Sequence, residues 1–202
     1  MLFEPFLPFK NKHLTFGFAQ NFWELRNYYQ LRKNVFCDEQ KIFKNSDVDA
    51  IDKKALHIIC TSEYMGMTDQ VIGTVCINEI NPMVWLGSRL SVHADYRTLR
   101  NYQSRNLFNG NVEVRPFTMS VGAGLIFKAV TSAKMLGCTQ FQAHVQYQNV
   151  PFFERLHWKS LGQIMLHGYL HHLMEADLNY YPAAERKHLA FDYGRTSLSK
   201  PV

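Results

Sequence analysis

The sequence predicts a single mixed α/β domain. Segments in which apolar and polar residues alternate, as in strands, are interspersed with segments of helical periodicity. Hydrophobic residues make up 47% of the 202 residues and charged residues only 19%, which is enough apolar surface for a sizeable core. The chain has no internal repeat and no low-complexity tract. We therefore expect one domain over residues 1–178 and a polar C-terminal tail over residues 179–202.

The first half of the chain predicts four strands and one helix. The strands are expected at residues 13–19, 55–62, 70–79 and 84–92, with turns at Gly66 and at Asn81-Pro82. The helix is expected at residues 22–36, and Asn21 is a suitable N-cap. The polar residues 37–54 predict a loop or a broken helix.

The second half predicts two helices and three strands. The longer helix is expected at residues 121–136, and Gly137 follows it where a left-handed residue is favoured. A short helix is expected at residues 150–156, and strands at residues 139–147, 161–166 and 171–178. The order is β-α-β-β-β-α-β-α-β-β, which indicates a mixed α/β domain.

The composition excludes several classes of protein. The net charge of +5 suits a polyanionic ligand, but the basic residues are dispersed and carry no nucleic-acid recognition motif. No apolar run approaches the roughly 18 residues of a membrane span. Residues 1–14 hold Glu4, two prolines and two lysines, and make a poor signal peptide. The four cysteines are scattered and never in CxxC spacing. This pattern predicts reduced thiols of a cytoplasmic protein, and neither disulfides nor a zinc site.

A glycine-containing turn opens the longer helix at Val121-Gly122-Ala123-Gly124. Two glycines in a first helical turn let an anion approach the unpaired N–H groups, where the helix dipole favours negative charge. A close contact between the helix and a strand would explain the same glycines. The turn by itself leaves both interpretations open.

Two segments resemble the motifs of the GNAT superfamily of acyl-CoA-dependent N-acyltransferases. The family pattern LxVxPxYRgxGxG is similar to LSVHADYR at residues 90–97, continued by Gly-Ala-Gly at residues 122–124. The pattern NxxAxxfYeklGF is similar to NVPFFERLHW at residues 149–158. Within the superfamily, Val35-Phe36, Glu39-Gln40, Asp49, Asp52 and His57 resemble the nitrogen-starvation-associated N-acetyltransferases of bacteria, and more distantly the acyl-homoserine lactone synthases.

The resemblance implies a fold and a co-substrate. It implies a mixed, mostly antiparallel sheet of about seven strands, flanked by helices and splayed between its fourth and fifth strands. Acetyl-CoA would lie in the splay, and the N–H of Val92 would donate to the thioester oxygen. The N–H groups of residues 122–124 would hold the pyrophosphate. The implied cofactor-binding residues are Leu90, Ser91, Val92, Arg97, Val121, Gly122, Ala123, Gly124, Leu125, Asn149, Phe152 and Phe153.

The chain departs from the family pattern in two places. Arg97 is followed by 24 residues before Gly122, whereas the family arginine stands three residues before the glycine. The inserted residues 98–120 carry Arg100, Arg105 and Arg115, and predict either a surface hairpin around Asn109-Gly110 or a flap that supplies an arginine to the phosphates. Phe153 stands where many family members place a tyrosine that protonates the leaving thiolate.

The acceptor side requires a base, since an ammonium must lose a proton before it attacks a thioester. Glu39 beside Asp38 is the candidate, because paired carboxylates can raise one pKa, and a solvated loop acid is the alternative. The acids at 47, 49 and 52 predict an ordered loop, and no metal is expected there or at His167, His171 and His172. His171 and His172 should point to opposite faces of a strand. Arg89 and His144, on the two splaying strands, are polar candidates for which a structural contact is favoured.

The sequence thus predicts an N-acetyltransferase that moves an acetyl group from acetyl-CoA to the amine of a small molecule. Two alternatives stay open: an acyltransferase for longer chains, suggested by the aromatic residues of the first helix, and a non-catalytic CoA-binding module, suggested by Phe153. No nucleic acid or membrane partner is expected, a homodimer is left open, and the expected location is the cytoplasm.

Overall fold

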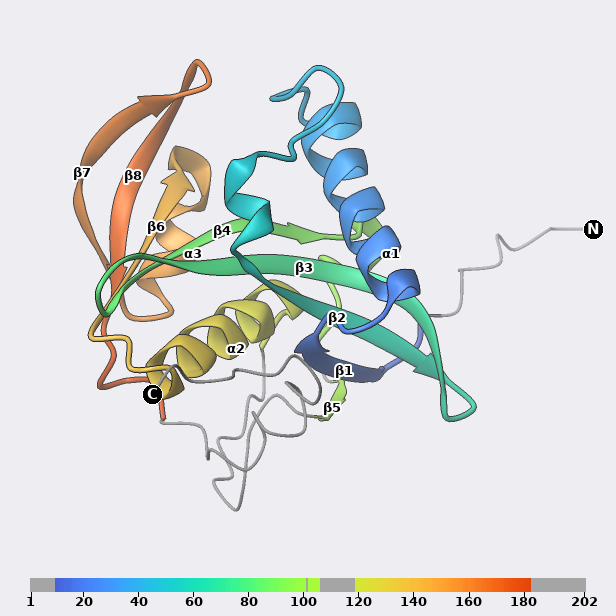
Figure 1. Ribbon diagram of the computed structural model, residues 1–202. Coiled ribbons are helices and arrows are strands. Elements are labelled where there is room, and N and C mark those ends of the chain that lie inside the picture. The colour runs from blue at the N-terminus through green and yellow to red at the C-terminus, as the bar shows by residue number, and fades with distance from the viewer. Residues whose placement is uncertain (1–9, 101, 106–118, 183–202) are drawn as a thin grey trace, which may run out of the picture.

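The structure is a computed structural model that describes residues 10–100, 102–105 and 119–182. Figure 1 shows a central sheet with α1 on one face and α2 on the other. The helices are α1 (Phe22–Lys33), α2 (Val121–Met135) and α3 (Val150–Glu154). The strands are β1 (His13–Phe18), β2 (Leu56–Tyr64), β3 (Met67–Asn81), β4 (Val84–Val92), β5 (Gln103–Arg105), β6 (Gln140–Gln146), β7 (Trp158–Leu166) and β8 (Tyr169–Ala176).

The eight described strands form one sheet in the order β5-β1-β2-β3-β4-β6-β8-β7. All neighbouring pairs are antiparallel except β1 with β5 and β4 with β6, which are parallel. The predicted class, a mixed and mostly antiparallel sheet flanked by helices, is confirmed. The eighth strand, β5, was not predicted, because three polar residues carry no alternation and pair with β1 only through their backbone.

The predicted cap of α1 is confirmed, but its predicted end is wrong. Asn21 accepts a hydrogen bond from the Glu24 amide at 2.9 Å, and Glu24 accepts from the Asn21 amide in return. Beyond Lys33 the chain continues as the π-helical turn η1 (Asn34–Glu39), in which the Gln40 amide donates to Val35 five residues back. The residues from Cys37 to Glu39 are therefore helical, which agrees with the broken-helix alternative for the start of residues 37–54. Single π turns recur at functional sites.

The main core lies between the sheet and α2. From Val121 to Ala133 every residue of α2 is buried, which fits its apolar composition. The helix lies close to β3 at Gly73, where an added Cβ would come 2.6 Å from Leu125. Gly137 ends the helix with a φ of 93°, as predicted for a left-handed residue. A second cluster, centred on Tyr28, Leu31 and Ile59, joins α1 to the opposite face.

The C-terminal hairpin differs from its predicted bounds. β7 begins at Trp158, three residues before the prediction, and β8 ends at Ala176, two residues before it. β7 is the last strand of the sheet and is exposed along most of its length, so it lacks the alternation that marks a half-buried strand.

Residues just past the predicted domain boundary at 178 pack onto the domain. Tyr181 is only 1% exposed and its hydroxyl donates to the Leu156 carbonyl at 2.6 Å. Lys134 of α2 donates to the carbonyls of Leu178 and Tyr181 at 2.7 and 2.9 Å. No helix within the described residues is long and apolar enough to span a bilayer.

Candidate active site

The sheet opens between β4 and β6. The two strands pair from Val84 with Gln140 to Gly87 with Ala143, and beyond that point both strands continue without pairing to each other. This is the predicted splay between the fourth and fifth expected strands. Backbone groups on the facing edges of the two strands are therefore free of the ladder that holds the rest of the sheet.

A β-bulge in β4 lies at the start of the splay. Thr74 pairs with Ser91 and Cys76 with Ser88, so Arg89 and its successor oppose Val75 alone. Arg89 has a φ of 55°, in the left-handed region that a non-glycine residue adopts at a cost of about 1–3 kcal/mol. Such strain persists only where the surroundings fix it, and at β4 they do so through the arginine side chain.

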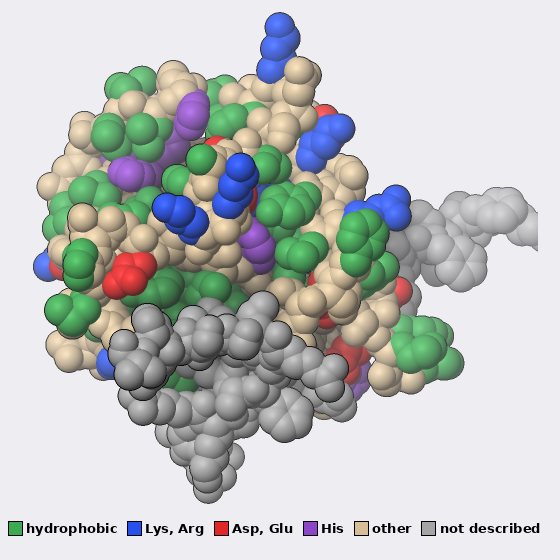
Figure 2. All heavy atoms as spheres, in the orientation of Figure 1, with side chains coloured by type: hydrophobic (Ala, Val, Ile, Leu, Met, Phe, Trp, Pro, Cys, Tyr) green, Lys and Arg blue, Asp and Glu red, His purple; other side chains and the backbone are tan. Residues whose placement is uncertain are grey.

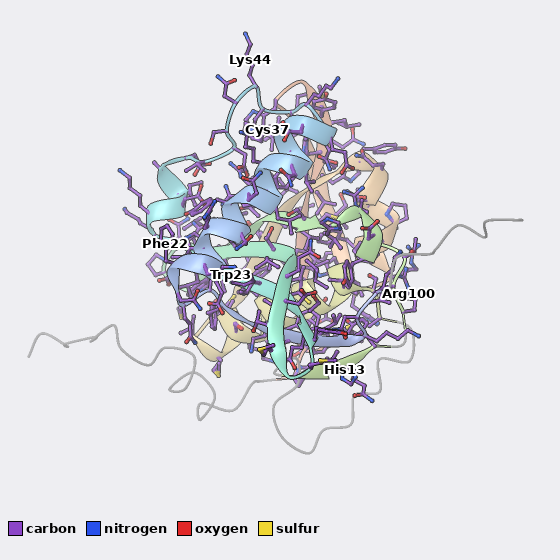
Figure 3. All side chains as sticks on the ribbon, turned by 90° about the vertical axis from the view of Figure 1, so that its right-hand side faces the viewer. His13, Phe22, Trp23, Cys37, Lys44 and Arg100 are labelled. Carbon is purple, nitrogen blue, oxygen red and sulfur yellow. The ribbon has the colours of Figure 1, made fainter. Side chains whose placement is uncertain are left out.

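The Arg89 guanidinium ties the bulge to the loop that follows α1. It donates to the Asp47 carbonyl at 3.1–3.2 Å and to the Asp49 carboxylate at 2.7 Å, and it lies 5.1 Å from the centre of the Phe43 ring. The structural contact favoured for Arg89 from the sequence is confirmed. Figure 3 shows Lys44 at the outer tip of the same loop, where it projects away from the body of the protein.

Arg32 of α1 holds this loop through buried hydrogen bonds. It is fully buried and donates to the Asp47 carboxylate at 2.7 Å, to both carboxylate oxygens of Asp52 and to the Tyr28 hydroxyl at 3.1 Å. Burial alone would raise the pKa of Asp52, but the hydrogen bonds from Arg32 and from the Asp49 amide outweigh it and lower that pKa. The prediction that these acids order the loop is confirmed.

A cavity of about 380 Å³ opens at the splay and reaches both faces of the sheet. On the α1 face its wall is formed by the π turn and the following loop, through Phe36, Gln40, Ile42, Phe43, Asp49 and Ile51. On the α2 face its wall is apolar, through Ile126, Ala129, Phe141, Phe153 and Trp158. The cavity therefore joins a polar and aromatic chamber to an apolar one through the gap between β4 and β6.

Three histidines line this cavity: His144 of β6, His167 in the turn between β7 and β8, and His171 of β8. Figure 2 shows histidine side chains gathered on this face over β6–β8, while lysines and arginines are dispersed over it. The predicted opposition of neighbouring histidines is confirmed. His171 lines the cavity, whereas His172 contacts Ser160 of β7 at 2.8 Å.

The backbone of Val92 faces the opening. The His93 amide donates to the Ile72 carbonyl on β3 at 2.8 Å, and successive amides of a strand point to opposite edges. The Val92 amide therefore points toward the side where β4 has no partner strand. Leu90 lines the cavity, and the Ser91 hydroxyl is turned inward to Thr74 at 2.6 Å. Of the three predicted residues, Ser91 can contribute only its backbone to a ligand.

The two glycines of the helix turn have different environments. A Cβ on Gly124 would lie 2.8 Å from the Phe16 ring and 2.9 Å from the Tyr102 hydroxyl, so this glycine serves close packing. A Cβ on Gly122 would meet only ordinary contacts at 3.8 Å, with Phe152 and Val92. The close-contact interpretation therefore applies to Gly124, while the space beside Gly122 is compatible with the approach of an anion.

The amides expected to hold the pyrophosphate are partly engaged. The Ala123 amide donates to the Ser120 hydroxyl at 3.2 Å, and the Gly124 amide donates to the Ser120 carbonyl at 2.9 Å. The prediction that the amides of residues 122–124 all serve an anion must be corrected, since an N-cap and the first helical hydrogen bond take two of them. The turn still offers the amides of Val121 and Gly122.

Glu39 and Arg97, expected on the acceptor and the phosphate side respectively, pair with each other. Two N–O distances of 2.6 Å join them, and Arg97 also donates to the Val92 carbonyl at 3.0 Å. The hydrogen bonds from Arg97 lower the pKa of Glu39, which contradicts the raised pKa that a neighbouring Asp38 could cause. The alternative interpretation from the sequence, a loop acid, fits this ion pair with an arginine 58 residues away.

The remaining predicted residues divide between the cavity and the core. Asn149 and Phe153 line the cavity, and Phe152 contacts Phe153 edge-on at 5.8 Å between ring centres. Val121 and Leu125 are fully buried, so neither side chain is available to a ligand.

The insertion is described only in part. Arg100 donates to the carbonyls of Arg97 and Leu99 at 3.1 and 2.9 Å, which ties it to its own segment. The side chain of Arg105, Arg115 and the expected hairpin at Asn109-Gly110 lie outside the described residues.

Several residues of the cavity wall were not singled out from the sequence. Phe43 and Gln146 belong to segments without a motif, and the wall reaches Gln40 only because the π turn shifts the helix end. Gln146 donates to Gln40 at 3.1 Å and so connects β6 to the π turn. A glutamine at the end of a strand or a phenylalanine in a loop carries no signal that could have indicated this.

The splayed sheet, the bulge at its fourth strand and the glycine turn after it together define the acyl-CoA N-acyltransferase fold of the GNAT type. No family model and no curated protein matches the chain. Solved structures do match it. A Lactobacillus plantarum protein described as an inferred N-acetyltransferase superposes with a TM-score of 0.64 and 18% identity, covering 82% of this chain and 99% of that chain.

Two further solved structures share the fold. An acyl-CoA N-acyltransferase from Pseudomonas aeruginosa has a TM-score of 0.56 and 14% identity, over 81% of this chain and 97% of that chain. BjaI, a CoA-dependent acyl-homoserine lactone synthase solved with SAM and isopentyl-CoA, has a TM-score of 0.55 and 15% identity, over 92% of this chain and 90% of that chain. Because the sequence identities are this low, these similarities show the fold alone.

Proposed function

We propose that the protein is an acyl-CoA-dependent N-acyltransferase that moves an acetyl group from acetyl-CoA to the amine of a small molecule. The observation that carries the proposal is the splay itself, since the free Val92 amide points into the gap where β4 and β6 separate. An amide at this place can donate to the thioester oxygen, on which negative charge develops as the amine attacks. The chamber on the α1 face would receive the amine.

The residues available to acyl-CoA fit the molecule in three parts. The backbone edge of Leu90 and Val92 would pair with pantetheine, and the free amides at the start of α2 would approach the pyrophosphate. Asn149, Phe152 and Phe153 would flank the cofactor's distal arm, where Asn149 and Phe153 line the cavity. Arg97 would stabilise the end of β4 through its contact with the Val92 carbonyl.

Release of thiol from acetyl-CoA tests the proposal. Thiol is measured with a disulfide dye while the protein is offered a panel of polyamines, amino acids, aminoglycosides and arylamines. We expect at least one amine to stimulate release and to gain 42 Da. If acetyl-CoA binds and no amine stimulates release, the non-catalytic CoA-binding alternative replaces the proposal.

Transfer of longer acyl chains is the second candidate, and the apolar end of the cavity favours it. Ile126, Ala129, Phe141 and Trp158 line the cavity below the splay, where a chain longer than acetyl could lie. The aromatic residues of α1 give no such support. Phe22 and Trp23 are 82% and 41% exposed at the start of the helix, and they do not line the cavity (Figure 3).

Replacing Ala143→Val tests this second candidate. Ala143 lines the cavity where β4 and β6 separate, so two added methyl groups narrow the passage to the apolar end. If long chains are used, kcat/KM for octanoyl-CoA should fall at least tenfold more than that for acetyl-CoA. Ala176→Val, a buried site on β8 outside the cavity wall, is the matched control. Equal effects on both donors would leave acetyl transfer as the function.

The finer resemblance to the nitrogen-starvation-associated N-acetyltransferases stays part of the proposal. It is supported by the buried contacts of Asp52 and by the His57 ring, which lies tilted against the Tyr28 ring with 4.8 Å between ring centres. We also propose a cytoplasmic location, supported by four free and buried cysteines. A homodimer is proposed from the edge strand β7, which exposes Leu161, Ile164 and Met165, and light scattering tests it.

A further inference from the structure

His171 is a buried histidine on the wall of the candidate acceptor chamber. It lies on β8 opposite Gln146 of β6 and is 7% exposed. Gln146 in turn contacts Gln40 beside the π turn, which places this side of β6 and β8 on the α1 face of the sheet. His171 therefore faces the chamber in which an amine would meet the thioester.

The hydrogen bond of His171 determines which ring nitrogen is basic. Its Nδ1 lies 2.9 Å from the carbonyl oxygen of Tyr169. A carbonyl can only accept, so Nδ1 carries the proton of the neutral ring and Nε2 keeps its lone pair. Nε2 makes no hydrogen bond with any residue in the described part of the chain. A base held in one tautomer with its basic nitrogen free is suited to accept a proton.

The other ionisable side chains of the cavity wall are Asp49, Arg89, His144 and His167. Asp49 accepts from the Ile51 amide at 2.8 Å and from Arg89 at 2.7 Å, so both its oxygens are engaged. Arg89 has no basic nitrogen at neutral pH. His167 lies in an exposed turn against the Phe43 ring. Desolvation and the neighbouring His171 lower the pKa of His144, which makes it a weaker base.

We propose that His171 is the catalytic base that deprotonates the acceptor amine, an inference that rests on the proposed acyl transfer. Nε2 takes one proton from the acceptor ammonium and passes it to solvent. The amine lone pair then forms the C–N bond, and the C–S bond breaks. The second proton of the attacking nitrogen goes to the CoA sulfur, so the step needs no acid at Phe153 and yields an amide and free thiol.

His171→Asn separates the chemical role from the structural one. The asparagine side-chain nitrogen can still donate to the Tyr169 carbonyl, while the basic nitrogen is lost. With an amine identified in the panel, we expect kcat to fall about 100-fold or more, with KM for acetyl-CoA within about twofold of the parent. Added imidazole should restore part of the rate. In the parent, the rate should fall at acid pH. In the variant, the rate should instead rise steadily with pH up to the pKa of the amine itself.

The control is His172→Asn. The His172 ring lies on the same strand as His171, but it points to the other face of the sheet and contacts the Ser160 hydroxyl. The control variant should keep kcat within about threefold of the parent, since the ring touches no part of the chamber. CoA affinity verifies that each variant is folded, and His171→Gln replaces His171→Asn if the latter is not. A folded variant with parental kcat and pH profile would overturn the role of His171 alone. If no amine stimulates thiol release by the parent protein, both the role of His171 and the proposed function would be overturned.

Discussion

Glu39 and Arg97 form a two-point ion pair that joins the end of the π turn to the segment after β4. Both N–O distances are 2.6 Å, although 58 residues separate the partners. The arginine reaches the carbonyl of Val92 as well, so the pair bridges the candidate acceptor chamber and the strand that would bind the thioester. Both oxygens of the carboxylate are thereby engaged by the arginine.

The first prediction is that Glu39→Gln keeps most of the activity. The pKa of Glu39 is lowered by its hydrogen bonds from Arg97, so the carboxylate is a poor proton acceptor. The pair is about half exposed and contributes about 1 kcal/mol or less to stability. We expect kcat within about fivefold of the parent, measured by thiol release with the best amine of the panel. A loss of 100-fold with parental CoA affinity would return the role of base to Glu39.

The second prediction concerns the buried charge network. Arg32→Leu leaves the buried Asp52 carboxylate without its cation and the buried Asp47 carboxylate with Arg89 alone, at 3.2 Å, which should lower the free energy of unfolding by about 3–5 kcal/mol. Urea denaturation measures this. Lys33→Leu is the control, because it removes an exposed charge from the next position and should change stability by about 0.5 kcal/mol or less. Similar losses in both variants would show that Arg32 does not hold the loop.

The third prediction is a loss of stability at acid pH through Asp52. Its pKa is lower in the folded protein than in the unfolded chain, so the unfolded state binds the proton at higher pH. The resulting stabilisation is fully present above the unfolded value of about 3.9 and is lost as pH falls through the folded value. Denaturation between pH 6 and pH 2.5 should show a steeper decline for the parent than for Asp52→Asn. Parallel curves would contradict the account.

The fourth prediction separates the two glycines of the α2 turn. Gly124→Ala should destabilise the protein by about 1–3 kcal/mol, since its methyl group would overlap the Phe16 ring and the Tyr102 hydroxyl. Gly122→Ala should be tolerated. Gly122→Val should raise the dissociation constant for acetyl-CoA at least tenfold, about 1.4 kcal/mol, because it screens the free amides. Urea denaturation measures the stability of the variants, and calorimetry measures their affinity for acetyl-CoA. Parental affinity in a folded Gly122→Val variant would exclude a phosphate site at this turn.

Most of the fold was predictable because local signals agree with the tertiary structure. The Asn21 cap, the Gly137 terminus and the alternation of β1 each depend on residues close in sequence. The polar strand β5 pairs with the distant β1, and the residue that follows the π turn, Gln40, accepts a hydrogen bond from Gln146 of β6. Such elements follow from tertiary packing and not from local preference.

The site was less predictable than the fold, because its charges are set by contacts across the chain. Asp38 is next to Glu39 in sequence, yet the distant Arg97 determines the pKa of Glu39. That His171 and His172 point to opposite faces of the sheet followed from strand geometry alone. The bond from His171 to the Tyr169 carbonyl did not, since it requires the geometry of the hairpin turn.

The central claim is that an acyl thioester lies in the splay with its oxygen at the Val92 amide. The most direct measurement is the amide NMR signal of Val92 in ¹⁵N-labelled protein, titrated with acetyl-CoA and separately with free CoA. We predict a downfield shift of the Val92 proton that is larger with acetyl-CoA than with free CoA, since only acetyl-CoA carries the thioester oxygen. The His93 amide, already bonded to Ile72, should move little. An unmoved Val92 signal in protein saturated with acetyl-CoA would contradict the claim.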